Sequence, residues 1–218
     1  MNYHIEFNLD FKRNPYPGTF IVLEGIDGSG KTTQIKRVKN SLTKLSGKEV
    51  FLTKEPTESV VGQLIKKIVR NELKVPKTAI QYLFCADRVI HLEKVVIPKL
   101  KEGAIVVSDR YFWSSLAYGI ADRNTLLAAQ SILSMYNQFI VPDFTFYLRV
   151  AVPTAISRLS QMQKTREIYE EKGKLLKIAK GYDWVVEQFP KEITVIDGEM
   201  SAEEVTKEII TKIKQINK

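Results

Sequence analysis

The sequence predicts an α/β domain built on a mostly parallel, five-stranded sheet with helices on both faces. Two observations predict this fold class. Short runs of branched and aromatic residues recur along the chain, and segments with apolar residues at helical spacing separate them. Strands that alternate with helices pair in parallel and are covered on both faces, so this order gives three layers. The 218 residues, 44% hydrophobic and 27% charged, suit one such domain.

The first predicted strand, 20–23, runs into a glycine-rich turn, 25–32, with the spacing G-x-x-x-x-G-K-T. A helix that ends at Gly47 is predicted after the turn, because apolar residues recur on one stripe: Ile35, Val38, Leu42 and Leu45. A glycine-rich turn between a buried strand and a helix is typical of a phosphate-binding loop (P-loop). The fold expected is therefore the three-layer P-loop NTPase fold.

The P-loop predicts a nucleotide phosphate site. Its glycines permit close approaches that a Cβ would prevent, and its backbone N–H groups surround an anion. Lys31 contributes a positive charge to the β- and γ-phosphates, and Thr32 offers a hydroxyl to Mg²⁺. The residues expected at the phosphates are those of the turn and the helix start: Gly25, Asp27, Gly28, Ser29, Gly30, Lys31, Thr32 and Thr33.

The other elements follow in order along the chain. Further strands are predicted at 49–53, 104–107, 144–148 and 193–196. Helices are predicted at 61–70, 125–139 and 175–188, and at 76–101 with an interruption near its end at Pro98. Another helix is predicted to begin at Pro153. A last helix is predicted at the C-terminus, where Val205, Ile209, Ile213 and Ile216 face the core. The polar stretch 158–174 is predicted to be a mobile lid. A turn rich in proline and glycine separates an N-terminal extension, 1–18, from a single domain, 19–218.

Three loops are expected to meet at the carboxyl ends of the strands, where ligands bind in such folds: the P-loop, 54–59 and 109–111. Asp109 is placed to hold a metal and Arg110 to bind a phosphate, and an ordinary surface ion pair between the two is the alternative. Phe84 and Arg88 lie four apart on one helix face, suited to stack on a base and to donate to it. Taken alone, they are better explained as a core aromatic and a salt-bridged arginine.

Composition excludes several classes of protein. The net charge of +8 is spread along the chain without a compact basic stripe, so nucleic-acid binding is not expected. No apolar run approaches the roughly 20 residues of a membrane span. Cys85 is the only cysteine, which excludes an internal disulfide and suits the cytoplasm. His4 and His91 belong to no zinc pattern.

The P-loop alone does not separate ATPases, GTPases and kinases. The base-reading N-K-x-D of common GTPases is absent, and motor and helicase ATPases usually carry more domains than this length allows. A small kinase is the best remaining class. Lys54 and Arg110 supply its second anion site, and 158–174 supplies a closing basic lid.

Several stretches, in order, resemble thymidylate kinases over 19–212. LEGIDGSGKTTQ is similar to that family's P-loop, TKEPTES at 53–59 to its T-R-E-P loop, and YLFCADRVIHLEKVVIPKL at 82–100 to its base-binding helix. SDRYFWSSLAYG at 108–119 is similar to its D-R-Y-x-x-S-x-x-A-Y stretch, and PDFTFYLRV and VIDGEMSAEEV to its later strands. The resemblance implies transfer of the γ-phosphoryl group of ATP to dTMP with Mg²⁺, and a homodimer. The apolar helices near 61–70 and 76–97 are expected to supply the face of that dimer.

The resemblance also implies roles for matching residues. Asp27 holds the sugar 3′-hydroxyl, Phe84 stacks on thymine and Arg88 donates to its O4. Arg110 binds the acceptor phosphate, and Asp109 helps to place metal and acceptor. The other acceptor-site residues are Lys54 at the phosphate, Ser114 and Ser115 along the base pocket, and Tyr118 against the 2′ position, where it favours deoxyribose.

Three departures from the family pattern concern the catalytic charges. Lys54 stands where arginine is usual, so it meets the phosphate as a point charge. Gly28 stands where one branch of the family carries a P-loop arginine, so the charge on the transferred phosphoryl group must be stabilised from the lid. Within the lid, Ile168 stands where the family has an arginine. The lid candidates are Arg158, Lys164 and Arg166, and the predicted catalytic set is Lys31, Asp109, Arg110, Arg158 and Arg166.

Two alternatives remain open at this point. A kinase for another nucleoside monophosphate, or for a deoxynucleoside, uses the same scaffold, and substrate competition separates it from a dTMP kinase. A P-loop protein that binds nucleotide to regulate a partner, without phosphoryl transfer, is the other. Absence of turnover with every monophosphate would favour it.

Overall fold

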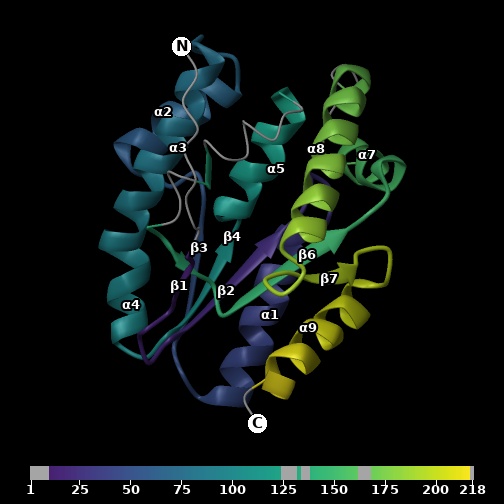
Figure 1. Cartoon of the computed structure of the whole chain (residues 1–218). Helices are drawn as coiled ribbons and strands as arrows, with labels where there is room; N and C mark the ends of the chain where they lie inside the picture. Colours follow the sequence, from purple (N-terminus) through teal and green to yellow (C-terminus); the bar gives the residue numbers. More distant parts are fainter. Residues whose placement is uncertain (1–9, 124–131, 134–137, 162–167, 217–218) are drawn as a thin grey trace.

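The central sheet has five strands, all parallel, in the order β3-β4-β2-β6-β7 (Figure 1). The structure is a computed structural model that describes residues 10–123, 132–133, 138–161 and 168–216. The strands are β2 Thr19–Glu24, β3 Val50–Lys54, β4 Ile105–Asp109, β6 Phe144–Arg149 and β7 Thr194–Asp197. The predicted parallel sheet is confirmed.

Helices cover both faces of this sheet, as predicted. They are α1 Lys31–Ser46, α2 Val60–Val69, α3 Lys77–His91, the π-helical turn η1 Leu92–Val96, α4 Ile97–Lys101, α5 Phe112–Arg123, α7 Val152–Ser160, α8 Ile168–Gln188 and α9 Ala202–Ile216. Helices α1 and α9 pack side by side on one face, while α4, α5 and α8 lie on the other (Figure 1). No helix in the described ranges has both the length and the apolar character needed to cross a lipid bilayer.

The central strand β2 shows how the two cores arise from one sequence. Its side chains alternate between faces: Ile21 and Leu23 join the core under α1 and α9, and Phe20 and Val22 join the core under α4 and α5. All four are fully buried. Since both faces are covered, β2 is a continuous apolar run rather than an alternating one.

Two helix predictions need correction. Leu45 was expected on the buried stripe of α1, but it is 53% exposed, because the whole last turn, 43–46, lies at the surface. The helix that starts at Lys77 is not interrupted by Pro98. It runs through the π-helical turn η1, in which the N–H of Ile97 donates to the carbonyl of Leu92, into α4. This wider turn stands directly before the proline, which has no N–H to donate.

The stretch 158–174, predicted as a loop-like lid, is helical at both ends. Helix α7 continues to Ser160, and α8 begins at Ile168, seven residues before the predicted start at 175. The loop prediction is therefore wrong for 168–174, where glutamates and lysines, which favour helix, extend the helix that the buried Leu175 and Ile178 anchor. Residues 162–167 lie outside the described residues, as does most of the helix predicted at 125–139.

A short strand near the N-terminus was not foreseen. Strand β1, Lys12–Arg13, pairs in parallel with β5, Ile140–Val141. Next to it, Phe11 packs against three rings, those of Phe112, Trp113 and Phe189, with centroids 5.7 to 6.0 Å away. Arg13 also forms an ion pair with Glu192. Residues 11–13 are thus packed against the domain.

Candidate active site

The three loops expected to meet at the carboxyl ends of the strands do so. Backbone hydrogen bonds of 3.0 Å connect their starts: the N–H of Glu55 donates to Asp109, and the N–H of Arg110 donates to Leu23. Two cavities open between the loops, one of about 550 Å³ at the P-loop and one of about 400 Å³ between α3, α5 and α8. They share four residues, Asp27, Glu55, Arg110 and Leu159. Two ligands can therefore lie end to end.

The P-loop has the backbone that its glycines predict. Gly28 has a φ of +81°, and a Cβ there would lie 2.4 Å from the carbonyl oxygen of Ala155, so a side chain would collide with α7. Lys31 is buried, and its ammonium donates to the carbonyls of Gly25 and Ile26 at 2.9 Å each. Burial, followed by the nearby charge of Arg110, lowers the pKa of Lys31 to about 8. All eight predicted phosphate contacts, 25 and 27–33, lie in this loop or at the start of α1, and the seven at 27–33 line the larger cavity.

The chemistry at the end of β4 fits a magnesium ion. Asp109 and Thr32 both line the larger cavity, and the Oδ1 atom of Asp109 is buried without a hydrogen bond to any described residue. The described residues contain no cluster of three or more histidine, cysteine or acidic side chains. Mg²⁺ usually keeps several waters and takes only one or two protein oxygens, so this sparse, oxygen-only set suits it.

Arg110 lies at the junction of the two cavities. Its φ of +71°, unusual for a residue other than glycine, accompanies the sharp turn from β4 into α5. Its Nη2 donates to Asp27 at 2.5 Å, and its Nη1 donates to the hydroxyls of Ser114 and Tyr182 at 3.1 Å each. The guanidinium lies over the ring of Tyr118. Four predicted acceptor-site residues are thus brought together.

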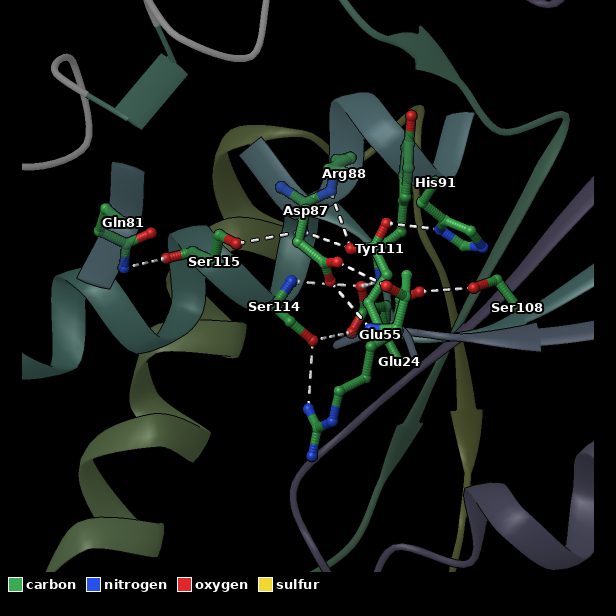
Figure 2. A network of polar contacts seen from close by, with 12 residues as sticks. Glu24, Glu55, Gln81, Asp87, Arg88, His91, Ser108, Tyr111, Ser114 and Ser115 are labelled. Atoms are coloured by element: carbon green, nitrogen blue, oxygen red, sulfur yellow. Dashed lines mark hydrogen bonds and ion pairs between the residues drawn. The ribbon is translucent and has the colours of Figure 1, made fainter. Parts of the chain in front are cut away.

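Arg88 extends from α3 into a buried ion-pair network (Figure 2). It donates to Glu55 at 2.9 and 2.5 Å and to the hydroxyl of Ser115 at 3.3 Å. The other oxygen of Glu55 lies 3.0 Å from His91, whose second ring nitrogen lies 2.6 Å from Thr53. The salt-bridged arginine that residue types alone favoured is present, and the same side chain lines the smaller cavity with Phe84.

Asp87 fixes the loop that carries Glu55. Its carboxylate accepts from the N–H and the hydroxyl of Thr57, at 2.8 and 2.5 Å, and from the hydroxyl of Ser59 at 2.7 Å. Sequence reasoning missed Asp87, Glu55 and His91. The dipeptide Glu55-Pro56 was visible as part of the stretch at 53–59, but the burial of its glutamate could not be read from a loop that is otherwise polar.

The remaining predicted residues lie at the edges of the site. Lys54 borders the larger cavity, where it pairs with Glu58 at 3.3 Å. Arg158 borders the same cavity and donates to the carbonyl of Gly198 at 3.0 Å. Arg166, like Lys164, lies outside the described residues. Of the three lid candidates, the structure therefore positions Arg158 alone.

Comparison with known proteins bears on this site. A model of the thymidylate kinase family matches residues 23–209. The chain belongs to the thymidylate kinase family. It is 38% identical over 209 residues to a probable thymidylate kinase of Pyrococcus horikoshii, covering 90% of this chain and 96% of the relative. A thymidylate kinase of Mesoplasma florum is 37% identical over 201 residues, covering 87% and 92%. The thymidylate kinase match includes the whole P-loop, all of α3 and α5, and the residues that line both cavities.

Proposed function

We propose that this protein transfers the γ-phosphoryl group of ATP to dTMP, giving ADP and dTDP, with Mg²⁺. The observation that carries the proposal is the pair of cavities that meet at Asp27 and Arg110. One is lined by a P-loop and the other by an aromatic, an arginine and serines. Membership of the thymidylate kinase family supports the choice of substrates.

On the donor side, the P-loop N–H groups and Lys31 bind the phosphates of ATP. On ATP binding, the Lys31 ammonium exchanges its two carbonyl partners for phosphate oxygens, and burial strengthens that contact. Thr32 and Asp109 hold Mg²⁺. When bound, the ion neutralises charge on the phosphate oxygens.

On the acceptor side, the smaller cavity takes dTMP with its phosphate toward Arg110. Phe84 stacks on thymine, Arg88 donates to O4, and Ser114 and Ser115 border the base. The remaining acceptor contacts are Asp27 at the 3′-hydroxyl, Lys54 and Arg110 at the phosphate, and Tyr118 at the 2′ position. Burial raises the pKa of Tyr118 to about 12, so its hydroxyl stays neutral. Since the dTMP phosphate is already an anion, transfer needs no general base.

Cations from 158–174 complete the catalytic set in this proposal. Arg158 is held at the larger cavity by Gly198, and Arg166 and Lys164 follow it in the chain. Closure of this segment over ATP would exclude water and so prevent hydrolysis of ATP.

We place the kinase domain at 19–218, after an extension at 1–18. We also propose that the protein is cytoplasmic, that it acts on nucleotides, and that it binds neither nucleic acid nor membranes.

The test is ADP production from ATP with dTMP, dUMP, UMP, CMP, thymidine or no acceptor, each with and without Mg²⁺. We expect dTMP to give by far the highest turnover and the omission of Mg²⁺ to abolish it. If UMP, CMP or thymidine is preferred, the P-loop assignment survives and the base-pocket assignment fails. If no acceptor stimulates turnover, the kinase proposal fails as a whole.

The quaternary proposal is a homodimer joined through α2 and α3. Both helices and the turn between them expose large apolar side chains: Val60 at 88%, Val69 at 58%, Leu73 at 42% and Tyr82 at 66%. Such a group of exposed apolar side chains marks an interaction surface. We expect sedimentation velocity to give a dimer and the double variant Val60→Glu/Tyr82→Glu to give a monomer. Leu45→Glu, at an equally apolar exposed site on α1, should remain a dimer. A monomeric parent protein at micromolar concentration would contradict the proposal.

A further inference from the structure

A buried carboxylate lies beneath Arg110 and has no role in the function proposed above. Glu24, at the end of β2, is 1% exposed. Its Oε1 accepts from the backbone N–H groups of Tyr111 at 2.9 Å and Ser114 at 3.2 Å. Its Oε2 accepts from the hydroxyls of Ser114 at 2.5 Å and Tyr182 at 2.8 Å (Figure 2 shows the contacts with Ser114 and Tyr111). Four donors from α5, its N-terminal turn and α8 thus hold one side chain.

Tyr182 connects this carboxylate to Arg110. Its hydroxyl donates to Glu24 and accepts from Nη1 of Arg110 at 3.1 Å. The hydroxyl of Ser114 makes the same pair of contacts and lies 2.8 Å from that of Tyr182. The hydroxyls of Ser114 and Tyr182 therefore lie between Glu24 and Arg110, and both orient the guanidinium group.

Packing brings Tyr182 to this position from far along the chain. At the preceding residue, Gly181, a Cβ would lie 2.2 Å from the carbonyl oxygen of Ala117, so α8 touches the backbone of α5 only because this residue is glycine. The ring of Tyr182 stacks on that of Tyr147 in β6, with centroids 4.8 Å apart and planes 14° apart. The ring is thus fixed from one side by β6, and its hydroxyl is directed at Arg110.

We propose that Tyr182, anchored by Glu24, is a positioning residue that holds Arg110 in the orientation required by the acceptor phosphate. This inference rests on the proposed kinase function. Tyr182 touches no substrate in it and acts through Arg110. Because α8 also supplies Lys174, Leu175 and Ile178 to the wall of the acceptor cavity, the same helix both borders the acceptor and orients its phosphate ligand.

The orientation of the Arg110 guanidinium group depends on these hydrogen bonds. Asp27, Ser114 and Tyr182 together restrain two of its nitrogens. Loss of the Tyr182 hydroxyl removes a hydrogen bond to a charged group and leaves Nη1 with Ser114. A guanidinium group binds a phosphate through two N–H groups that lie in its plane. A small rotation of the Arg110 guanidinium group therefore weakens the contact with the phosphate even though the charge remains.

The test is Tyr182→Phe, which keeps the ring and its stacking. We expect the KM for dTMP to rise about 10- to 100-fold, while the KM for ATP stays close to that of the parent. The melting temperature should fall by only a few degrees, because Glu24 loses one of its four hydrogen-bond donors. The matched control is Tyr147→Phe, which removes a hydroxyl from the other ring of the stacked pair. Its KM for dTMP should match that of the parent.

A ligand comparison separates positioning of Arg110 from a general effect on the cavity. Calorimetric or competition binding of dTMP should weaken in Tyr182→Phe, whereas binding of thymidine, which lacks the phosphate, should not change. An equal weakening of both ligands, or an unchanged KM for dTMP, would overturn the inference. If the parent protein does not phosphorylate dTMP at all, the proposed function fails first, and the two failures are therefore distinguishable.

Discussion

Lys31→Met is expected to lower kcat for dTMP phosphorylation by roughly 100-fold or more, the typical cost of removing one preorganised contact with transition-state charge. The lysine is buried, and its ammonium already lies at the P-loop, 2.9 Å from two backbone carbonyls. Methionine preserves most of the apolar stem but not the charge. Initial-rate measurements at saturating ATP and dTMP give kcat directly.

The matched control for this variant is Lys36→Met, on the same helix. Lys36 is exposed and has no role in the proposed transfer, so its kcat should stay within about twofold of the parent. Circular dichroism and the melting temperature establish that both variants fold. A Lys31→Met protein that folds and keeps most of its kcat would remove Lys31 from the catalytic set.

Glu55→Gln is expected to destabilise the fold by about 3 kcal/mol or more, because it leaves Arg88 as a buried charge without its counter-ion. Both side chains are almost fully buried, and they meet at 2.5 Å. The amide still accepts one hydrogen bond, but it cannot balance the charge or hold His91 in the same way. Urea denaturation followed by fluorescence measures the change in the free energy of unfolding.

Glu58→Gln is the matched control, since this glutamate lies in the same loop and also pairs with cations, Lys54 and Lys66. It is exposed, however, and exposed ion pairs contribute roughly 0 to 1 kcal/mol. The two variants make the same chemical change at different burial. Equal loss of stability in both would show that the network around Glu55 does not hold the loop against α3.

The fold could be predicted because its signals are local. Each strand of the sheet is a short apolar run, each helix after it has a periodic stripe, and the G-x-x-x-x-G-K-T spacing marks the first turn between them. The errors are also local in origin. Strand β1 is only two residues long, and the start of α8 has a composition as suited to a solvated loop as to an exposed helical turn.

The polar contacts of the site could not be predicted in the same way. Arg88 was recognisable, but its partner Glu55 lies 33 residues away, and Tyr182 lies 158 residues from Glu24. Such pairs depend on how three elements pack rather than on any spacing within one. The burial of a glutamate within a polar loop, or of a tyrosine behind Gly181, is therefore visible only in three dimensions.

The π-helical turn η1 changes the angular course of the long helix that contains it. Phe84, Arg88, Leu92, Val96 and Leu100 follow one another at intervals of four. In a regular α-helix a step of four residues advances by about 40° beyond a full turn, so this line would wind around the helix by about 160°. The wider turn at 92–96 takes up part of that drift. One unbroken helix can thus line the acceptor cavity with Phe84 and Arg88 while Val96 and Leu100 stay in the core beneath the sheet, and deleting one residue from 92–96 would rotate these two halves against each other by about 100°.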